Sequence, residues 1–328
     1  MKKRLLILIL TLLLLSGLRA WAYPLAPVST RPQREVAVSK ALLWLHAQQQ
    51  ADGAVGGLGE SCDIARTVAQ AGEDPDGPEW TPGNVSLLER CKLDLPDYLA
   101  RKDAGRIAKV LRAAVATGAD PRNFDGYDLI ALLEAQYDPE TGFYHPYNLF
   151  RNALAIIALN EAGRSIPAKT ISAVAGEQNP DGCWGWPIGG NTTDADTTGL
   201  VLHALAGAGY AEHPAVVQCV GALMARQLSD GSWESRWGDA VGNSNSTALV
   251  IQGLVAAGWD PEGPAFTKDR TAVRALLAFQ AADGSFLWRY DQQGTLLLST
   301  KQAIPPLIMT YPNEVLKPRT LYLPLVGR

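Results

Sequence analysis

The sequence predicts an all-α protein, an (α/α)6 toroid in which six helical hairpins close into an inner and an outer ring of helices. Two recurring phrases predict this fold. One is an apolar segment that opens on Asp or Asn and closes on Gly, and its copies at 196–209 and 245–258 align without a gap. The other is Gln-x-x-Asp-Gly, usually followed by an aromatic residue, which starts at Gln49, Gln178, Gln227 and Gln280 and more loosely at Gln136. Phrases that recur every few tens of residues indicate stacked supersecondary units.

The segment before each Gln-x-x-Asp-Gly phrase is expected to be an outer helix. These segments carry charged residues on one face, which is typical of a helix that is exposed on one side. The weakest pattern is that of the second segment. The six predicted outer helices are 35–49, 86–99, 127–136, 167–178, 214–227 and 271–280.

The apolar segments are expected to be the inner helices. Asp, Asn, Ser or Thr near their starts can cap free backbone amides, and the apolar residues that follow indicate burial nearly all round. Glycines at 72, 118, 163, 209 and 258 are expected to end helices in the left-handed conformation. The six predicted inner helices are 63–72, 107–118, 151–163, 196–209, 245–258 and 299–309.

The Gln-x-x-Asp-Gly phrase itself is interpreted as a structural turn between an outer and an inner helix. We expect the Gln side chain to reach back to carbonyls at the end of the outer helix, and the Asp to accept backbone amides. The Gly takes the left-handed conformation, and the aromatic residue packs over the turn.

The first 22 residues are typical of a secretory signal peptide. Lys2, Lys3 and Arg4 precede an apolar run, and Ala20-Trp21-Ala22 fits a cleavage site. The apolar run is short for a bilayer of about 30 Å, and no later run is long enough to span one. We therefore expect a secreted, extracytoplasmic protein with a toroid at 23–312 and an extended, Pro-containing tail at 313–328.

The net charge limits the kinds of binding partner, and the cysteine content indicates disulfides. Without residues 1–22, which hold four basic and no acidic residues, 25 basic and 33 acidic residues remain, a net charge of −8. An acidic surface repels phosphate backbones, so nucleic acid is not expected as a partner. Four cysteines in an exported chain indicate disulfides. Three pairings exist, and we favour Cys62–Cys91 and Cys183–Cys219 because each joins adjacent repeats; buried free thiols are the alternative.

The repeats resemble the QW-type repeats of squalene-hopene and oxidosqualene cyclases. The same toroid occurs in protein prenyltransferase β subunits and in cobalamin carriers, and the resemblance covers nearly all of the chain after residue 22. It implies the fold strongly and the function weakly, because one fold hosts unrelated sites.

The resemblance to class II terpene cyclases gives one catalytic hypothesis. Their Asp-x-Asp-Asp motif matches Asp194-Ala195-Asp196-Thr197, with Thr197 in place of the last Asp. The resemblance implies that Asp196 acts as a general acid beside Asp194 in an apolar cavity. Three arguments oppose it. Such cyclases use a second helical domain for which this chain is too short, an exported location does not suit a membrane-lipid precursor as substrate, and Asp196 also fits a helix N-cap.

The prenyltransferase resemblance implies a zinc site that the residues do not supply. None of the four histidines forms a ligand-spaced cluster with Cys or Asp. We therefore expect no metal and no cofactor.

Loops before the inner helices are rich in aromatic and amide side chains and are expected to meet at one mouth of the ring. Such groups are typical of a small-molecule site, although the tryptophans also suit simple packing. The candidate ligand-binding residues are Tyr144, Tyr147, Asn148, Trp186, Asn191, Trp237, Asn243, Asn245 and Trp288.

Three functions remain open from the sequence. The favoured one is a binding protein, not an enzyme, that holds a small amphipathic ligand (isoprenoid, corrinoid or glycan) or a partner segment in the toroid mouth. The second is a cyclase-like enzyme that uses Asp196. The third is a structural cell-surface module whose tail contacts a surface protein.

Overall fold

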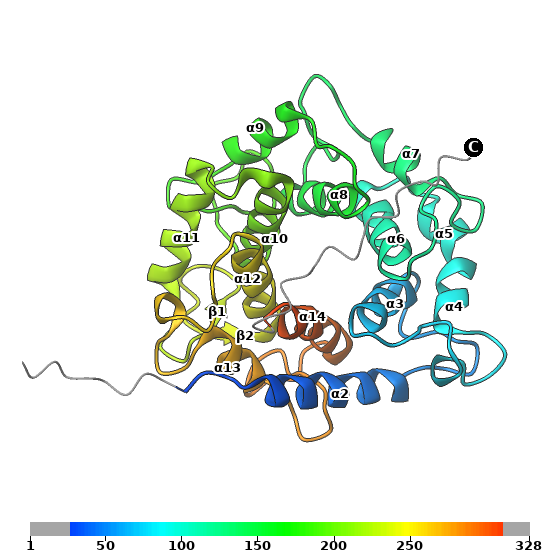
Figure 1. The fold of residues 1–328 in the computed structure, drawn as a ribbon. Helices are drawn as coiled ribbons and strands as arrows, with labels where there is room; N and C mark the ends of the chain where they lie inside the picture. The colour runs from blue at the N-terminus through cyan, green and yellow to red at the C-terminus, as the bar shows by residue number, and fades with distance from the viewer. Residues whose placement is uncertain (1–26, 311–328) are drawn as a thin grey trace, which may run out of the picture.

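The computed structural model describes residues 27–310, which form a closed double ring of helices (Figure 1). The predicted signal peptide and the tail at 313–328 lie outside the described residues. The inner ring consists of α3 (Glu60–Gln70), α6 (Ala104–Ala116), α8 (Leu149–Glu161), α10 (Ala195–Leu205), α12 (Ser244–Ala256) and α14 (Leu296–Met309). The outer ring consists of α2 (Arg31–Ala47), α4 (Leu87–Leu93), α5 (Leu95–Leu99), α7 (Leu129–Glu134), α9 (Ala168–Gly176), α11 (Pro214–Arg226) and α13 (Ala272–Leu277).

The inner ring closes on itself. Each inner helix packs against the next one in chain order, and α14 returns to pack against α3 and α2. Their apolar side chains form one continuous core between the two rings. The all-α toroid predicted from the sequence is therefore confirmed.

The predicted inner helices agree closely with the observed ones, including their ends. The five glycines expected to terminate them, at 72, 118, 163, 209 and 258, all have positive φ. α10 departs slightly from the prediction, because it is followed by a π-helical turn, Ala206–Tyr210, which contains Gly209. The weakest outer segment, 86–99, is two short helices, α4 and α5, which meet at Asp94.

The Gln of the recurring phrase has a different role from the one expected. The Gln227 amide donates to Gly231 O in its own turn at 2.9 Å and to Phe266 O in the next unit at 2.8 Å. Gln280 donates likewise to Gly284 O and to Ala37 O of α2, which joins the last unit to the first. The expectation that Gln reaches back to its own helix was wrong for these copies, because each amide donates to one carbonyl of its own turn and to one carbonyl of the neighbouring unit.

The loose copy behaves as originally expected. Gln136 donates to Leu132 O within its own outer helix. In the four full copies the Asp accepts a backbone amide two residues on, and the Gly has positive φ. The aromatic residues that follow, Trp184, Trp233 and Phe286, are fully buried. The phrase therefore fastens neighbouring hairpins together.

Two disulfides stabilise the outer part of the ring. Cys62 on α3 pairs with Cys91 on α4, and Cys183 pairs with Cys219 on α11, which are the pairs favoured from the sequence. Two short strands, β1 (Trp233–Glu234) and β2 (Gly242–Asn243), pair antiparallel in the loop before α12.

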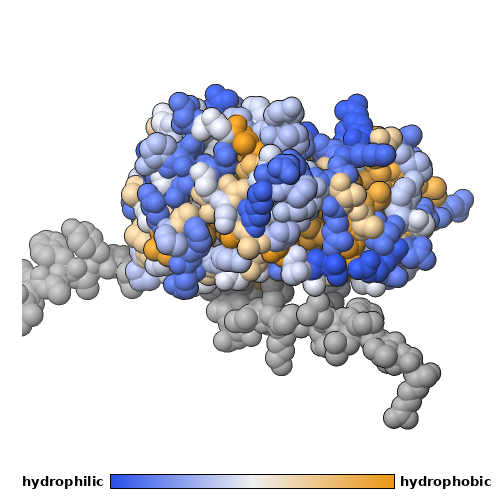
Figure 2. All heavy atoms as spheres, turned by 90° about the horizontal axis from the view of Figure 1, so that it is seen from above, coloured by the Kyte–Doolittle hydropathy of each residue, from blue (hydrophilic) through white to orange (hydrophobic). Residues whose placement is uncertain are grey.

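The edge of the disc is largely hydrophilic, with smaller hydrophobic areas between the charged side chains (Figure 2). This agrees with outer helices that are exposed on one face. Among residues 27–310, no helix has the length and apolar character needed to cross a membrane.

Candidate functional site

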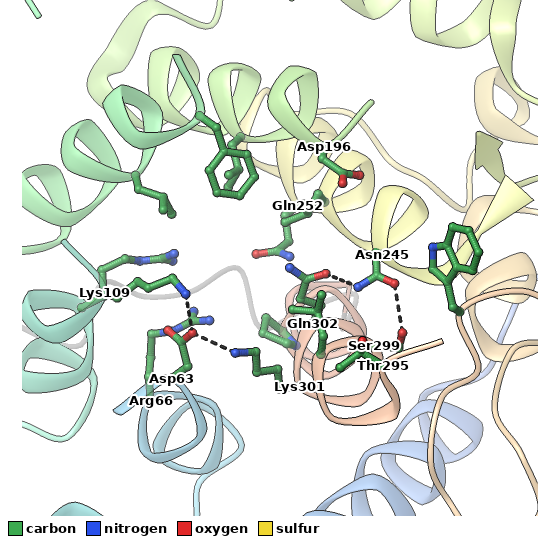
Figure 3. Close-up of a pocket in the computed structure, with 18 of the residues that line it drawn as sticks. Asp63, Arg66, Lys109, Asp196, Asn245, Gln252, Thr295, Ser299, Lys301 and Gln302 are labelled. Carbon is green, nitrogen blue, oxygen red and sulfur yellow. Dashed lines mark hydrogen bonds and ion pairs between the residues drawn. The ribbon is translucent and has the colours of Figure 1, made fainter. Parts of the chain in front are cut away.

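A cavity of about 550 Å³ occupies the centre of the inner ring. All six inner helices and the loop before α14 contribute side chains to it (Figure 3). The two sides of the cavity differ in chemistry, because the inner helices present apolar side chains on one side and charged ones on the other.

The apolar wall is formed by consecutive helices of the ring. Phe150 and Leu154 come from α8, Leu200 from α10 and Leu249 from α12. Residues three or four apart lie on one helix face. On α8 that face is apolar, whereas on α10 and α12 the same face also carries Asp196, Asn245 and Gln252.

The opposite wall is centred on a buried carboxylate. Asp63 on α3 lies 2.9 Å from the Lys109 ammonium of α6 and 2.9 Å from the Lys301 ammonium of α14. Lys301 also pairs with Glu60. Burial alone would raise the pKa of Asp63, but the charges of Lys301, Lys109 and Arg66 outweigh it and hold the pKa far below its usual range. Asp63 is therefore ionised and holds three helices together.

Two arginines lie deeper on the same wall. Arg112 of α6 makes two parallel hydrogen bonds of 2.8 Å to the Glu161 carboxylate of α8, the strong bidentate geometry. Arg66 of α3 donates to Gln70 Oε1 at 3.2 Å. Burial and the repulsion of Arg112 lower the pKa of Arg66 to about 10.

Asp196 lies at the mouth end of the cavity, in the first turn of α10. Ser246 Oγ on α12 donates to Asp196 Oδ1 at 2.6 Å. Burial raises the pKa of Asp196 to about 6; the Ser246 hydrogen bond opposes this shift, and the charge of Asp194 adds to it. Asp196 is thus a carboxyl group that can hold or release a proton near neutral pH.

Amide and hydroxyl groups continue the polar lining beside Asp196. Asn245 Nδ2 donates to Gln302 Oε1 at 2.6 Å, and Asn245 Oδ1 accepts from Ser299 Oγ at 3.0 Å. Trp288 lines the same end, and its carbonyl accepts the amide of Ser244 at the start of α12. Three of the residues singled out from the sequence, Asp196, Asn245 and Trp288, are therefore brought together in one cavity.

Three other candidates have side chains that cap inner helices. Asp194 accepts the amide of Thr197 at 2.7 Å and the amide of Trp186 at 2.9 Å. Asn148 and Asn243 cap α8 and α12 in the same way. The N-cap of α10 is thus Asp194, and Asp196 is left to face the cavity.

The remaining aromatic and amide candidates lie outside the cavity lining. Tyr144 is buried beside the Tyr137 ring, and Trp237 packs against the Arg226 guanidinium. Tyr147, Trp186 and Asn191 are exposed on the loops before α8 and α10. Whether these residues contact a ligand stays a prediction.

Sequence reasoning missed most of the charged wall. The apolar pattern predicts helices that are buried nearly all round, and it assigns no role to their few charged residues. A charge inside such a helix was the available signal, because a buried charge must be paired or functional. The missed residues of this wall are Asp63, Arg66, Lys109, Arg112 and Lys301.

Metal ligation has no evident site in the part of the chain that the structure describes. Within residues 27–310, no three His, Cys, Asp or Glu side chains are grouped so that they could hold a metal ion.

The similarity of this chain to known proteins agrees with its toroid fold. Residues 190–293 match the family model of the squalene-hopene cyclase C-terminal domain. No curated protein matches the sequence. The type II terpene cyclase MstE from Scytonema is similar at 15% identity with a TM-score of 0.62, over 84% of this chain and 98% of its own.

Two further solved structures share the fold. ent-Copalyl diphosphate synthase from Streptomyces platensis is 18% identical with a TM-score of 0.52, over 77% of this chain and 50% of its own. A glycosidase in complex with glucose is 16% identical with a TM-score of 0.54, over 85% and 96%. The chain therefore has the α/α-toroid fold of the terpenoid cyclase superfamily. At such identities the similarity extends to fold and not to activity.

One argument from the sequence is corrected by these comparisons. A second helical domain was held to be necessary for a class II cyclase. MstE is matched over 98% of its length by this single toroid, so chain length does not exclude that activity.

Proposed function

We propose that this protein binds a small amphipathic molecule in the central cavity of the toroid. The observation that carries the proposal is the division of the cavity into an apolar wall on α8, α10 and α12 and a charged wall on α3, α6 and α14. Its volume of about 550 Å³ falls within the range of small-molecule sites, which combine apolar surface with a few placed polar groups.

The apolar wall favours an isoprenoid-like ligand over a glycan. Burying apolar surface contributes roughly 25 cal/mol per Å², and a sugar would leave its hydroxyl groups unpaired against Phe150, Leu154, Leu200 and Leu249. A structural relative supports this choice: a variant of MstE, 15% identical to this chain, has been solved in complex with geranylgeranyl dihydroxybenzoate.

A cavity-blocking substitution tests the proposal. Leu298 lines the cavity and is 39% exposed, so Leu298→Trp adds bulk there without disturbing a buried packing contact. Leu43→Trp, on the outer face of α2 where Leu43 is 69% exposed, is the matched control. We expect farnesol to bind the wild type and the control in isothermal titration, and Leu298→Trp to bind at least about tenfold more weakly. Equal binding by all three proteins would contradict a site in the cavity.

A second candidate function is proton-initiated cyclisation of an isoprenoid. The observation that favours it is Asp196, which lines an apolar-walled cavity with its pKa raised to about 6. Such an acid is protonated in mildly acidic solution and in part near neutral pH, and its protonated form can deliver the proton to an alkene. Thr197 replaces the last Asp of the motif, and Asp194 is engaged as a helix cap, so Asp196 would act alone.

Product analysis distinguishes catalysis from binding. Wild type and Asp196→Asn are incubated with squalene and with geranylgeranyl diphosphate, and products are analysed by gas chromatography and mass spectrometry. Catalysis predicts a cyclic product from the wild type and none from the variant. The same product from both, or none from the wild type, would remove this candidate and leave binding.

We also propose that the protein is exported. The basic start, apolar run and Ala-x-Ala site of residues 1–22 support this, as do two disulfides, which persist in oxidising compartments. Mass spectrometry of the protein recovered outside the cytoplasm should find Tyr23 as its first residue. An intact Met1 in a cytoplasmic protein would contradict export.

A further inference from the structure

The charged wall of the cavity holds more basic than acidic side chains. Asp63 is shared by Lys109 and Lys301, Lys301 also contacts Glu60, and Arg112 is occupied by Glu161. The basic side chains are Arg66, Lys109, Arg112 and Lys301, and the carboxylates are Glu60, Asp63 and Glu161. One unit of positive charge is left over.

That excess charge lies on Arg66. Its guanidinium donates to the neutral amide oxygen of Gln70, and within residues 27–310 no carboxylate forms an ion pair with it. Asp196, the remaining carboxyl group of the cavity lining, lies on α10 and accepts a hydrogen bond from Ser246. Burial and the repulsion of Arg112 lower the pKa of Arg66, while the charges of Asp63 and Glu161 act in the opposite direction.

We propose that Arg66 binds a single carboxylate group of the ligand. This inference rests on the proposed function, because it orients the same amphipathic molecule in the same cavity. The anionic end lies against α3 and α6, and the apolar part lies against Phe150, Leu154, Leu200 and Leu249. A planar guanidinium matches the two oxygens of a carboxylate in a bidentate pair.

The charge count favours a carboxylate over a phosphate or diphosphate. A carboxylate brings one negative charge, which the excess on Arg66 neutralises. A phosphate monoester brings about 1.5 to 2 negative charges, and a diphosphate brings more. The negative charge of such a ligand that Arg66 does not neutralise would stay in the cavity beside Asp63 and Asp196, where an unpaired charge is costly.

Three ligands with the same isoprenoid chain test this inference. Farnesol, farnesoic acid and farnesyl diphosphate are titrated against the wild type. Charge-assisted hydrogen bonds predict that the acid binds about tenfold or more tightly than the alcohol, and more tightly than the diphosphate. Arg66→Gln should lose the preference and bind acid and alcohol about equally. Arg66→Lys should keep part of the preference, because it keeps the charge without the planar fork.

Arg122→Gln is the matched control, since it removes an exposed arginine from the outer surface and should keep the full preference for the acid. A preference that survives in Arg66→Gln, or tighter binding of the diphosphate by the wild type, would overturn the role of Arg66 while binding in the cavity stands. If none of the three ligands binds the wild type, the proposed function fails and this inference fails with it.

Discussion

The hydroxyl of Ser246 on α12 donates a 2.6 Å hydrogen bond to the carboxylate of Asp196 on α10. This bond joins two neighbouring inner helices at the mouth of the cavity. It also sets the acidity of the carboxyl group: burial raises the pKa of Asp196 to about 6, while the Ser246 hydroxyl works in the opposite direction by stabilising the ionised form.

The first prediction concerns the pH dependence contributed by Asp196. Its folded pKa of about 6 lies above the model value of 3.8, so ionisation destabilises the folded state as pH rises through this interval. Asp196→Asn removes that cost. The free energy of unfolding of the variant, relative to wild type, should rise by roughly 2–3 kcal/mol between pH 4 and pH 8, as measured by urea denaturation. Asp239→Asn, an exposed site, should show no such change.

Ser246→Ala tests the cause of that acidity. Because the lost hydroxyl favours the ionised carboxylate, the pKa of Asp196 should rise further above 6 in the variant. Carbon-13 NMR of the labelled carboxyl groups measures it. A pKa that falls on removal of Ser246 would contradict the assigned hydrogen bond.

The buried carboxylate of Asp63 should be essential for stability. Asp63→Asn leaves the ammonium groups of Lys109 and Lys301 without their shared partner, and breaking such a buried pair costs about 3–5 kcal/mol. The double variant Asp63→Asn with Lys301→Met should recover part of the loss. Because the pKa of Asp63 is lowered, its contribution is present above pH 3.8 and is lost as pH falls through the folded value. The difference from wild type should therefore shrink in acid.

Closure of the ring depends on Gln280. Its side chain donates to Ala37 O at 2.8 Å and to Gly284 O at 3.0 Å, so it joins the last hairpin to the first. Gln280→Ala removes both hydrogen bonds and should cost roughly 1–3 kcal/mol in denaturant unfolding. Gln136→Ala, which breaks one bond within its own helix, should cost less. Equal losses would mean that the bond between hairpins adds nothing.

Gly284 should tolerate a side chain less well than Gly72, although both have positive φ, of 96° and 91°. An added Cβ at Gly284 would lie 2.4 Å from Lys40 O in α2, whereas one at Gly72 meets no atom within 4 Å. Gly72→Ala should cost about 1–2 kcal/mol from backbone strain alone, and Gly284→Ala clearly more. Thermal unfolding of both variants makes the comparison.

The toroid was predictable because its repeats are local patterns. Four inner helices, α6, α8, α10 and α12, begin at a capping side chain such as Asp194 or Asn243 and end near a glycine such as Gly209 or Gly258. These signals act within one turn of chain. The bond from Gln280 to Ala37 was not predictable, because its partners lie 243 residues apart and meet when the ring closes.

The candidate site was predictable only where the repeat itself changes. Asp196 and Asn245 occupy equivalent positions 49 residues apart in the two aligned copies, and both line the cavity. Arg66 and Lys301 lie in different hairpins and belong to no common sequence motif. No local pattern therefore predicts that both line the same cavity. The loop residues Tyr144 and Trp237 were predicted as ligand contacts, but they pack within the protein and lie outside the cavity lining.

A crystal structure of the wild type in complex with farnesoic acid tests most directly whether the cavity binds an isoprenoid chain with its carboxylate at Arg66. The account predicts the isoprenoid chain against Phe150, Leu154, Leu200 and Leu249, with the carboxylate at the Arg66 guanidinium. A ligand bound on the outer surface, or an empty cavity at a saturating concentration of the acid, would contradict it.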